Sequence, residues 1–282
     1  MTDQHAGPIR PEELEAWRAH VGRQENRRQR LDVESLRRFA AAQGADLDVE
    51  RQPPPLSHWA YFLEAVEPDA IGPDGHPRRG GLLPSVRLPR RMFAAAVMEF
   101  IEPLALDEPA ELTLTVADVR HRAGKTGELV FVEIDRKVSQ DGRQRLTERQ
   151  TIVYRGLGEP TPAVEPTDLP PHRNAEVWTP GPVDLFRFSA VTFNSHRIHY
   201  DLPYVQTEEG YPGLVVHGPF TAAKLFAFAR SHAGRAIRRF EFRAQAPLFA
   251  GQPITLAPGA EEGEVQAIRC DGTVAMSAKA VF

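Results

Sequence analysis

The chain has 282 residues, of which 41% are apolar, and this is enough to fill the cores of about two domains or of one duplicated unit. Its formal net charge of -4 gives no broad basic field, so nucleic acid is disfavoured as a partner. The single cysteine, Cys270, cannot form an internal disulfide and lies in a strand-like segment, so a reducing cytoplasm is the expected location.

The chain shows no sign of export or of membrane insertion. Its first residues, MTDQHAGPIRPEELEAW, contain no apolar core of a signal peptide and no small-residue cleavage site. The longest apolar stretch, residues 213–229, is interrupted by His217, Pro219 and Lys224 and is too short to span a bilayer comfortably. We therefore expect no membrane partner.

The N-terminal third begins with helical patterns and continues irregularly. Residues 11–21 and 33–43 carry apolar side chains at helical spacing and are predicted to form two short helices. Residues 52–91 are rich in Pro, Gly and Arg, which predicts a long irregular connection. Connections of this length are often functional.

An antiparallel meander is predicted next. Apolar residues alternate with polar ones from Leu112 to Val116, and a turn at AGKTG (123–127) leads to a second strand through residues 130–134. Asp141-Gly142 is a good hairpin turn, because glycine tolerates a positive φ, and residues 146–154 complete the meander.

A proline-rich segment separates two halves of the chain. Residues 159–175 form the predicted linker, so that the expected domains are 1–158 and 176–282. The prolines of this segment are Pro160, Pro162, Pro166, Pro170 and Pro171.

The second half contains a long helix that is apolar on nearly every side, from Gly218 to about His232. A strand over residues 239–245 follows, and two more strands meet at Asp271-Gly272. Because such a helix has to be buried, an antiparallel sheet that curls around it is expected. The long strands before residue 158 suggest a second helix-wrapped sheet beside the first.

Asn194 and His199 are the candidate catalytic residues, because they precede this helix in the segment FNSHRIHYD. The segment GYPGLVVHGPF brings the chain to the first turn of the helix, where Pro219 fits well and Gly218 leaves a free N–H at the positive end of the helix dipole. Such donors stabilise the enolate that forms from a thioester carbonyl, and loss of one typically costs about 3 kcal/mol of transition-state energy.

The two candidates differ in chemistry. The imidazole of His199 can take a proton from water and return one near neutral pH. The amide of Asn194 does not titrate, so its expected role is to orient the water. A lone histidine such as His196 is more often a hydrogen-bonded structural residue.

These motifs resemble the hydratase 2 motif of MaoC-like enoyl-thioester hydratases, in which Asp-x-x-x-x-His is followed by His-Gly before a central helix. The subgroup that looks most similar contains the FAS1-like dehydratase domain: type 2 hydroxyacyl-thioester dehydratases, mesaconyl-C4-CoA hydratase and itaconyl-CoA hydratase. The segments RIHYD, GYPGLVVHGP and, in the first half, LPRRMFA are typical of it. The resemblance therefore covers both halves.

The resemblance implies an α+β double hot-dog fold, two antiparallel sheets that each wrap a central helix. It also implies a catalytic C-terminal half and a non-catalytic N-terminal half that shapes the substrate tunnel. By position, His199 matches the catalytic histidine, and Gly218 matches the glycine whose N–H holds the thioester oxygen. Asn194 replaces the aspartate of many MaoC proteins, which removes one titrating group. The implied substrate is a CoA thioester, with no cofactor, and a homodimer is expected.

Several further residues are candidates for substrate binding. His217 directly precedes Gly218, and Arg197, within the motif, is a candidate partner for a substrate carboxylate. Arg90 and Arg91 belong to a basic cluster that could bind CoA phosphates or a carboxylate, because guanidinium matches both bidentately. The alternative is a solvated loop. The other members of the cluster are Arg78, Arg79 and Arg87.

Other classes of site are disfavoured. HRAGKTG has Val119 where a phosphate-binding loop requires glycine. No metal is expected, because the histidines near His199 and Asp201 follow no ligand motif such as H-E-x-x-H. A serine hydrolase is disfavoured, because there is no G-x-S-x-G.

The leading hypothesis is therefore an enoyl-thioester hydratase, a hydro-lyase that acts reversibly as a 3-hydroxyacyl-thioester dehydratase on short or branched acyl-CoA. Two alternatives stay open. One is a hot-dog thioesterase in which His199 directs water to the carbonyl carbon. The other is a non-catalytic protein that binds acyl thioesters, suggested by the missing aspartate.

Overall fold

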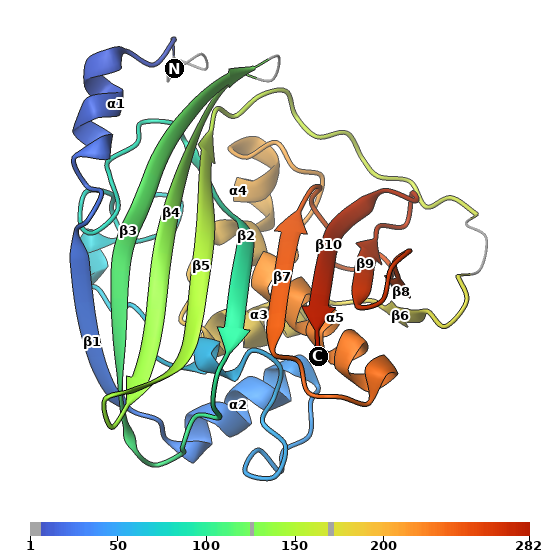
Figure 1. Ribbon diagram of the computed structural model, residues 1–282. Helices are drawn as coiled ribbons and strands as arrows, with labels where there is room; N and C mark the ends of the chain where they lie inside the picture. Colours follow the sequence, from blue (N-terminus) through green and yellow to red (C-terminus); the bar gives the residue numbers. More distant parts are fainter. Residues whose placement is uncertain (1–6, 125–126, 169–171) are drawn as a thin grey trace.

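The computed structural model describes residues 7–124, 127–168 and 172–282 and contains one antiparallel sheet of ten strands (Figure 1). The strand order is β1-β3-β4-β5-β2-β7-β10-β9-β8-β6. The strands of the first half are β1 (Gln24–Arg30), β2 (Arg90–Phe100), β3 (Pro109–Gly124), β4 (Gly127–Gln140) and β5 (Arg143–Arg155). Those of the second half are β6 (Glu176–Trp178), β7 (Arg239–Ala244), β8 (Ile254–Pro258), β9 (Glu264–Ile268) and β10 (Val274–Val281).

The two halves meet edge to edge at β2 and β7, whose antiparallel register runs from the pair Ala95–Arg243 to the pair Glu99–Arg239. The prediction of two separate sheets thus differs from the structure, in which the half-sheets are continuous. Aromatic rings pack at this seam: Phe93 of β2 lies 5.5 Å from Phe242 of β7 and 5.9 Å from Trp59, between ring centroids. Burial of these rings stabilises the junction.

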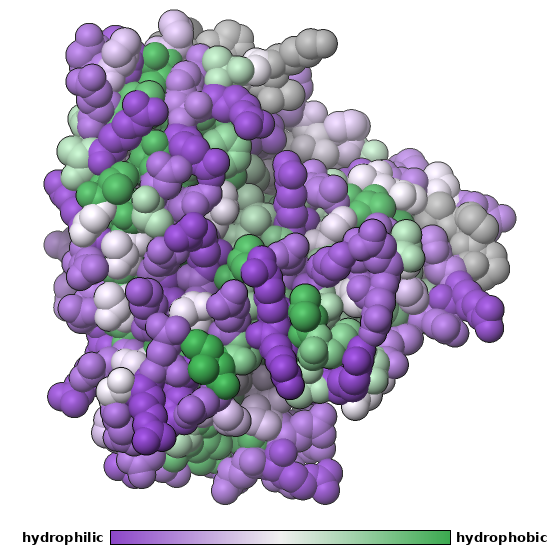
Figure 2. Space-filling view, in the orientation of Figure 1, coloured by the Kyte–Doolittle hydropathy of each residue, from purple (hydrophilic) through white to green (hydrophobic). Residues whose placement is uncertain are grey.

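The helices lie mainly on one face of the sheet. They are α1 (Pro11–Arg18), α2 (Val33–Gln43), α3 (Pro182–Val191), α4 (Leu202–Thr207) and α5 (Gly218–Ala233), with short 3-10 turns η1 (Ser57–Ala60), η2 (Pro68–Ala70) and η3 (Arg197–His199). Figure 1 shows α3, α4 and α5 behind the sheet, and the opposite face, turned to the viewer in Figure 2, is mostly hydrophilic.

The predicted helix after Gly218 is confirmed and is the core helix of the second half. It ends at Gly234, which adopts a left-handed conformation that glycine tolerates (φ 61°), and it packs against β7, β8, β9 and β10 and against β2. By contrast, α2 packs against helices α3 and α5. Side chains of β3, β4 and β5 line a cavity. The prediction that each half of the sheet wraps a central helix therefore describes the second half better than the first.

The other predicted elements are largely confirmed. The helix at residues 33–43 has the expected bounds, with the Asp32 side chain accepting a 2.7 Å hydrogen bond from the N–H of Ser35. The residues that the structure leaves undescribed include part of the AGKTG turn (125–126) and of the linker (169–171). Strand β1 was not predicted, because its sequence QENRRQR has no apolar face. In the structure it is an edge strand that pairs with β3. Among the described residues, no helix is both long and apolar enough to cross a bilayer.

A buried polar cluster lies in the sheet of the first half. The Glu148 carboxylate accepts hydrogen bonds from Trp59 Nε1 (3.0 Å) and Gln150 Nε2 (2.8 Å) and forms an ion pair with Arg136 (3.0 Å). Burial alone would raise the pKa of Glu148, but Arg136 and His58 lower it to about 2. Trp59, Arg136 and Gln150 also line the cavity, so this carboxylate organises the cavity wall.

We predict that Glu148→Gln lowers the free energy of unfolding by roughly 3–5 kcal/mol, because removal of the carboxylate leaves the largely buried guanidinium of Arg136 without its ion-pair partner. Urea unfolding followed by circular dichroism measures the change. The matched control is Glu111→Gln, whose ion pair with Arg28 is more than half exposed and should contribute less than about 1 kcal/mol. Equal stability of the two variants would contradict a structural role for the Glu148 cluster.

Candidate active site

The segment that carries Asn194 turns sharply after helix α3. Phe193 adopts a left-handed conformation (φ 49°), and the N–H of Asn194 donates to the carbonyl of Ser189 at 2.9 Å. The Oδ1 atom of Asn194 accepts a 3.0 Å hydrogen bond from the N–H of His196. Its oxygen is therefore engaged by the backbone, and the NH2 group of the amide is the part that can contact a ligand.

His199 lies in η3 and is 6% exposed. Its Nδ1 donates to the carbonyl of Val215 at 2.7 Å, and this bond leaves Nε2 as the unprotonated nitrogen of a neutral ring. Burial lowers the pKa of His199 to about 4. At neutral pH this side chain is consequently a proton acceptor.

His217 fixes the position of His199 relative to helix α5. The two rings stack with centroids 3.5 Å apart and planes inclined by 19°, and His217 is the N-cap residue of α5, directly before Gly218. Its Nε2 lies 2.8 Å from the hydroxyl of Ser189, and burial holds its pKa well below its usual range. The structure thus brings His199, His217 and Gly218 together where the buried helix begins, and Asn194 lines the same cavity as Pro219 of that helix. Their roles in the reaction stay predictions.

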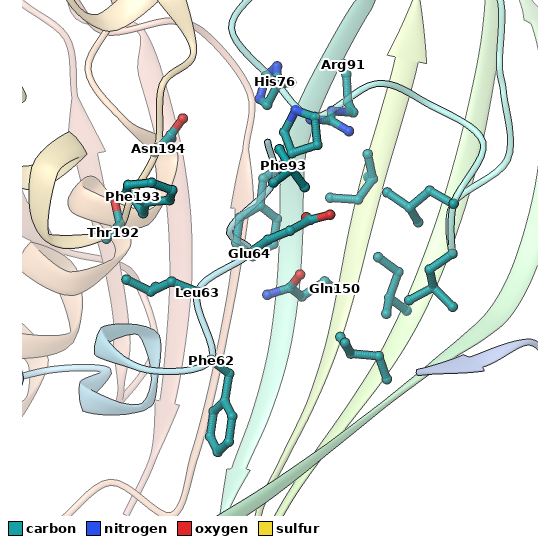
Figure 3. A pocket seen from close by; sticks show the side chains of 18 of the residues that line it. Phe62, Leu63, Glu64, His76, Arg91, Phe93, Gln150, Thr192, Phe193 and Asn194 are labelled. Carbon is teal, nitrogen blue, oxygen red and sulfur yellow. The ribbon is translucent and has the colours of Figure 1, made fainter. Parts of the chain in front are cut away.

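A cavity of about 390 Å³ opens beside this helix start. Its walls come from strands β2 to β5, from the irregular connection 59–83, and from the second half at Asn194 and Pro219 (Figure 3). Pro219, the second residue of α5, belongs to this lining, whereas His199 and Gly218 are not among the residues that line the cavity. The cavity mixes apolar groups with charged ones, as expected of a site that orients a small acyl group.

The three arginines predicted to bind substrate divide into two kinds. Arg91 lines the cavity, where it lies beside His76 (Figure 3), and the described residues place no carboxylate within ion-pair distance of it. Arg90, on the opposite face of the same strand, is buried in an ion pair with Glu209 at 3.1 Å. Arg197 donates to Asp201 (2.7 Å) and lies over the ring of Tyr204. These contacts favour structural roles for Arg90 and Arg197, in contrast to their prediction as substrate ligands.

The connection between η2 and β2 contributes residues that the sequence analysis did not select. Within it, the loop of residues 72–77 docks on the Asn194 segment: the N–H of Arg197 donates to the carbonyl of Asp74 at 2.9 Å, and Ser195 Oγ donates to the carbonyl of Gly75. This contact places the ring of His76 4.0 Å from that of His196, between centroids. The length of the connection was the available signal, but its contact with residues 194–197 is a tertiary feature.

Comparisons with known proteins identify relatives of this chain. A family model of hydroxyacyl-thioester dehydratase type 2 matches residues 56–250. A mesaconyl-C4-CoA hydratase from Chloroflexus aurantiacus is 46% identical over 229 residues, which are 80% of this chain and 82% of the relative.

Solved structures support the fold. A MaoC-like dehydratase from Phytophthora capsici aligns with a TM-score of 0.69 at 14% identity, covering 95% of this chain and 97% of the other. A Mycobacterium tuberculosis protein described as having a double hot-dog fold aligns with a TM-score of 0.52 at 13% identity, covering 92% and 95%. The double hot-dog prediction is thereby confirmed.

We predict that Gly75→Ala destabilises the docked loop. Gly75 has a φ of 88°, and an added Cβ would lie 1.9 Å from the carbonyl oxygen of Ser195, so the loop or the Asn194 segment has to move. A cost of at least about 2 kcal/mol should lower Tm by roughly 4 °C or more in a thermal melt. Gly81→Ala is the control, because its Cβ would meet no atom within 4 Å. If both variants melt together with the wild type, the docking contact is weaker than described.

Proposed function

Because this chain belongs to the hydroxyacyl-thioester dehydratase type 2 family, we propose that it adds water reversibly to a short, branched enoyl-CoA, with mesaconyl-C4-CoA as the foremost candidate. The family membership confirms the prediction of a hydro-lyase that acts on acyl thioesters. The observation that carries the proposal is the cavity lined by Asn194 and by the first turn of α5, together with the stacking of His199 on His217, the N-cap residue of that helix.

The proposed chemistry uses the helix start and two side chains. The N–H groups of the first turn of α5 lack partners within the helix, so that of Gly218 can hold the thioester oxygen as it becomes an enolate. His199 Nε2 takes a proton from water as the water oxygen bonds to the β-carbon. The NH2 group of Asn194 donates to the water oxygen and orients it. The enolate then takes a proton at the α-carbon, which completes the addition of water without net oxidation or reduction, so the reaction requires no redox cofactor.

Arg91 is proposed to recognise the acyl group. In a mesaconyl-C4 thioester the free carboxylate is attached to the carbon that receives water, so its counter-ion has to lie close to the reacting centre. Arg91 meets this requirement, because it lines the cavity next to His76 and near Asn194. A guanidinium binds a carboxylate through two charge-assisted hydrogen bonds, which also fixes the direction of the acyl chain.

Four expectations from the sequence stay predictions: assembly as a homodimer, a cytoplasmic location, the division into domains 1–158 and 176–282, and catalysis without a metal. The itaconyl-CoA alternative also stays a prediction, and a substrate panel addresses it directly.

We predict that the purified protein hydrates mesaconyl-C4-CoA, and that His199→Ala lowers kcat at least about a hundredfold, because the proton acceptor is lost. Loss of the enoyl absorbance measures turnover, with crotonyl-CoA and itaconyl-CoA in the same panel. A thiol reagent run in parallel detects free CoA. Release of CoA without hydration would identify a thioesterase, and binding without either reaction would identify a non-catalytic protein.

We predict that Arg91→Gln lowers kcat/KM for mesaconyl-C4-CoA at least about a hundredfold, because the substrate carboxylate then enters the cavity unpaired. The matched probe is 3-methylcrotonyl-CoA, which has a methyl group in place of that carboxylate. As a substrate or competitive inhibitor it should change less than about tenfold.

Arg78→Gln is the control for this test, because it removes the same charge from an exposed position at the cavity rim. It should preserve the discrimination between the two thioesters. An equal loss for both thioesters in Arg91→Gln would assign Arg91 to structure or to CoA binding and would remove its role in reading the carboxylate.

A further inference from the structure

A histidine from the first half of the chain reaches the reacting end of the cavity. His76 lies in the loop of residues 72–77, and its side chain lines the cavity next to Arg91 (Figure 3). Its Nδ1 lies 3.1 Å from Asp74 Oδ2, and the carboxylate can accept only from a protonated nitrogen. The Nδ1–H bond orients the ring and leaves Nε2 as the atom that can exchange a proton, the arrangement by which a carboxylate prepares a catalytic histidine.

His76 and His199 flank a third imidazole. The ring of His196 lies 4.0 Å from that of His76 and 5.5 Å from that of His199, between centroids. The three rings thus run from the cavity wall of the first half to the start of α5 in the second. Two different imidazoles can then exchange protons at the two reacting carbons of a bound acyl chain, which are adjacent atoms.

Asn194 leaves a chemical role unfilled at this site. Its Oδ1 accepts one hydrogen bond from the N–H of His196, and an amide has no proton to exchange at neutral pH. His199 supplies one acceptor, whereas the reaction needs a proton removed from one atom and a proton supplied to another. The Asp74–His76 pair is a titrating group whose histidine lines the same cavity as Asn194.

The charges around His76 keep it neutral at rest. Burial lowers the pKa of His76, and Arg91 and Arg79 lower it further, while the hydrogen bond and charge of Asp74 oppose them. His196 also faces the ring, and burial holds its pKa far below its usual range. Burial alone would raise the pKa of Asp74, but His76 and Arg91 bring it to about 2, so this carboxylate is ionised and can stabilise an imidazolium beside it.

We propose that His76, held by Asp74, is a second catalytic residue of this site and exchanges the proton at the α-carbon of the substrate; this inference rests on the proposed hydratase function. In the dehydration direction His76 Nε2 takes the α-proton, and the electron pair of the broken C–H bond forms the enolate at the thioester oxygen. The enolate returns this pair to form the double bond and expels the hydroxyl group from the β-carbon. The hydroxyl group leaves as water with a proton from the imidazolium form of His199.

Hydration is the reverse of these steps. Hydration begins from the form in which His76 Nε2 has taken up one proton from solvent. His199 takes a proton from water, the water oxygen bonds to the β-carbon to give the enolate, and His76 delivers its proton to the α-carbon. One proton is taken up and one is released in each direction, and exchange with solvent returns both rings to their starting states.

Binding of a metal ion is an alternative role for the same residues. Within the described chain, donor atoms of Asp74, His76 and His196 lie within 4.8 Å of one another. Two features oppose a cation there: His76 is already hydrogen-bonded to Asp74, and the positive charges of Arg79 and Arg91 act on the same ring. We therefore assign the pair to proton transfer, and the experiment includes the metal as an outcome.

The test separates proton exchange at the α-carbon from complete turnover. The hydrated product is incubated in D2O with wild-type protein, His76→Gln, Asp74→Asn or His199→Gln, and mass spectrometry follows deuterium uptake at the α-carbon. We expect His76→Gln to lose at least about a hundredfold in kcat and in exchange, with KM changed less than about threefold. His199→Gln should lose turnover but retain exchange, and this residual exchange should fall as the pH drops through the lowered pKa of His76.

Two variants test whether the effects are specific to the imidazole of His76. His121→Gln removes a histidine with a glutamate partner on the β3–β4 hairpin, outside the cavity, and should behave as wild type. Asp74→Asn keeps a side-chain oxygen for the N–H of His76, so it preserves the loop and should slow exchange through the loss of charge alone. Circular dichroism verifies that each variant is folded.

The outcomes are distinguishable. Wild-type protein that turns over no enoyl-CoA refutes the proposed function, whereas active wild type with normal exchange in His76→Gln refutes only the role of His76. Loss of exchange in His199→Gln assigns both proton transfers to His199 and also overturns the proposal. Exchange that is abolished by EDTA and restored by Zn²⁺ would replace the Asp74–His76 pair with a metal site.

Discussion

The pairing of β2 with β7 is the constraint on which the rest of the structure depends. It makes one sheet from two half-sheets, and Arg91 and Phe93, which line the cavity, lie on β2 close to the seam. Helix α5 leads directly into β7, so the same pairing sets where the helix start stands relative to the cavity. A shift of one residue in this register would turn the side chains of β2 to the opposite face of the sheet. The cavity therefore exists only while the seam holds.

Burial is the second determinant of the site, because it decides the protonation of its histidines. His196, His199 and His217 are each less than 9% exposed, and withdrawal from water favours the neutral ring in all three. Their hydrogen bonds then define which nitrogen is free, as the carbonyl of Val215 does for His199. A cluster of imidazoles that would otherwise repel one another as cations is in this way compatible with close stacking.

The first half of the chain supplies more than a wall of the cavity. Its sheet carries the Glu148 cluster, which holds Trp59, Arg136 and Gln150 in place in the wall of the cavity. Its long connection returns to the Asn194 segment and seats His76 there, through backbone contacts that require glycine at position 75. The substrate-binding space and its proton-transfer groups are thus shared between halves, which is consistent with the two halves being kept in one chain.

The sequence by itself determined the elements whose signals are local. The apolar helix at residues 218–232, the Asp141-Gly142 turn and the helix at residues 33–43 each appear where expected, because composition, spacing and turn chemistry act over a few residues. The spacing of Asn194, His199 and Gly218 likewise predicted a site at one helix end. Only the tertiary structure decided that Arg91 faces the cavity while Arg90 is paired with Glu209, because strand alternation and a partner 119 residues away choose between them. The same holds for His76, which reaches the site through the docking of a loop on a segment about 120 residues further along the chain, a contact that no local pattern encodes.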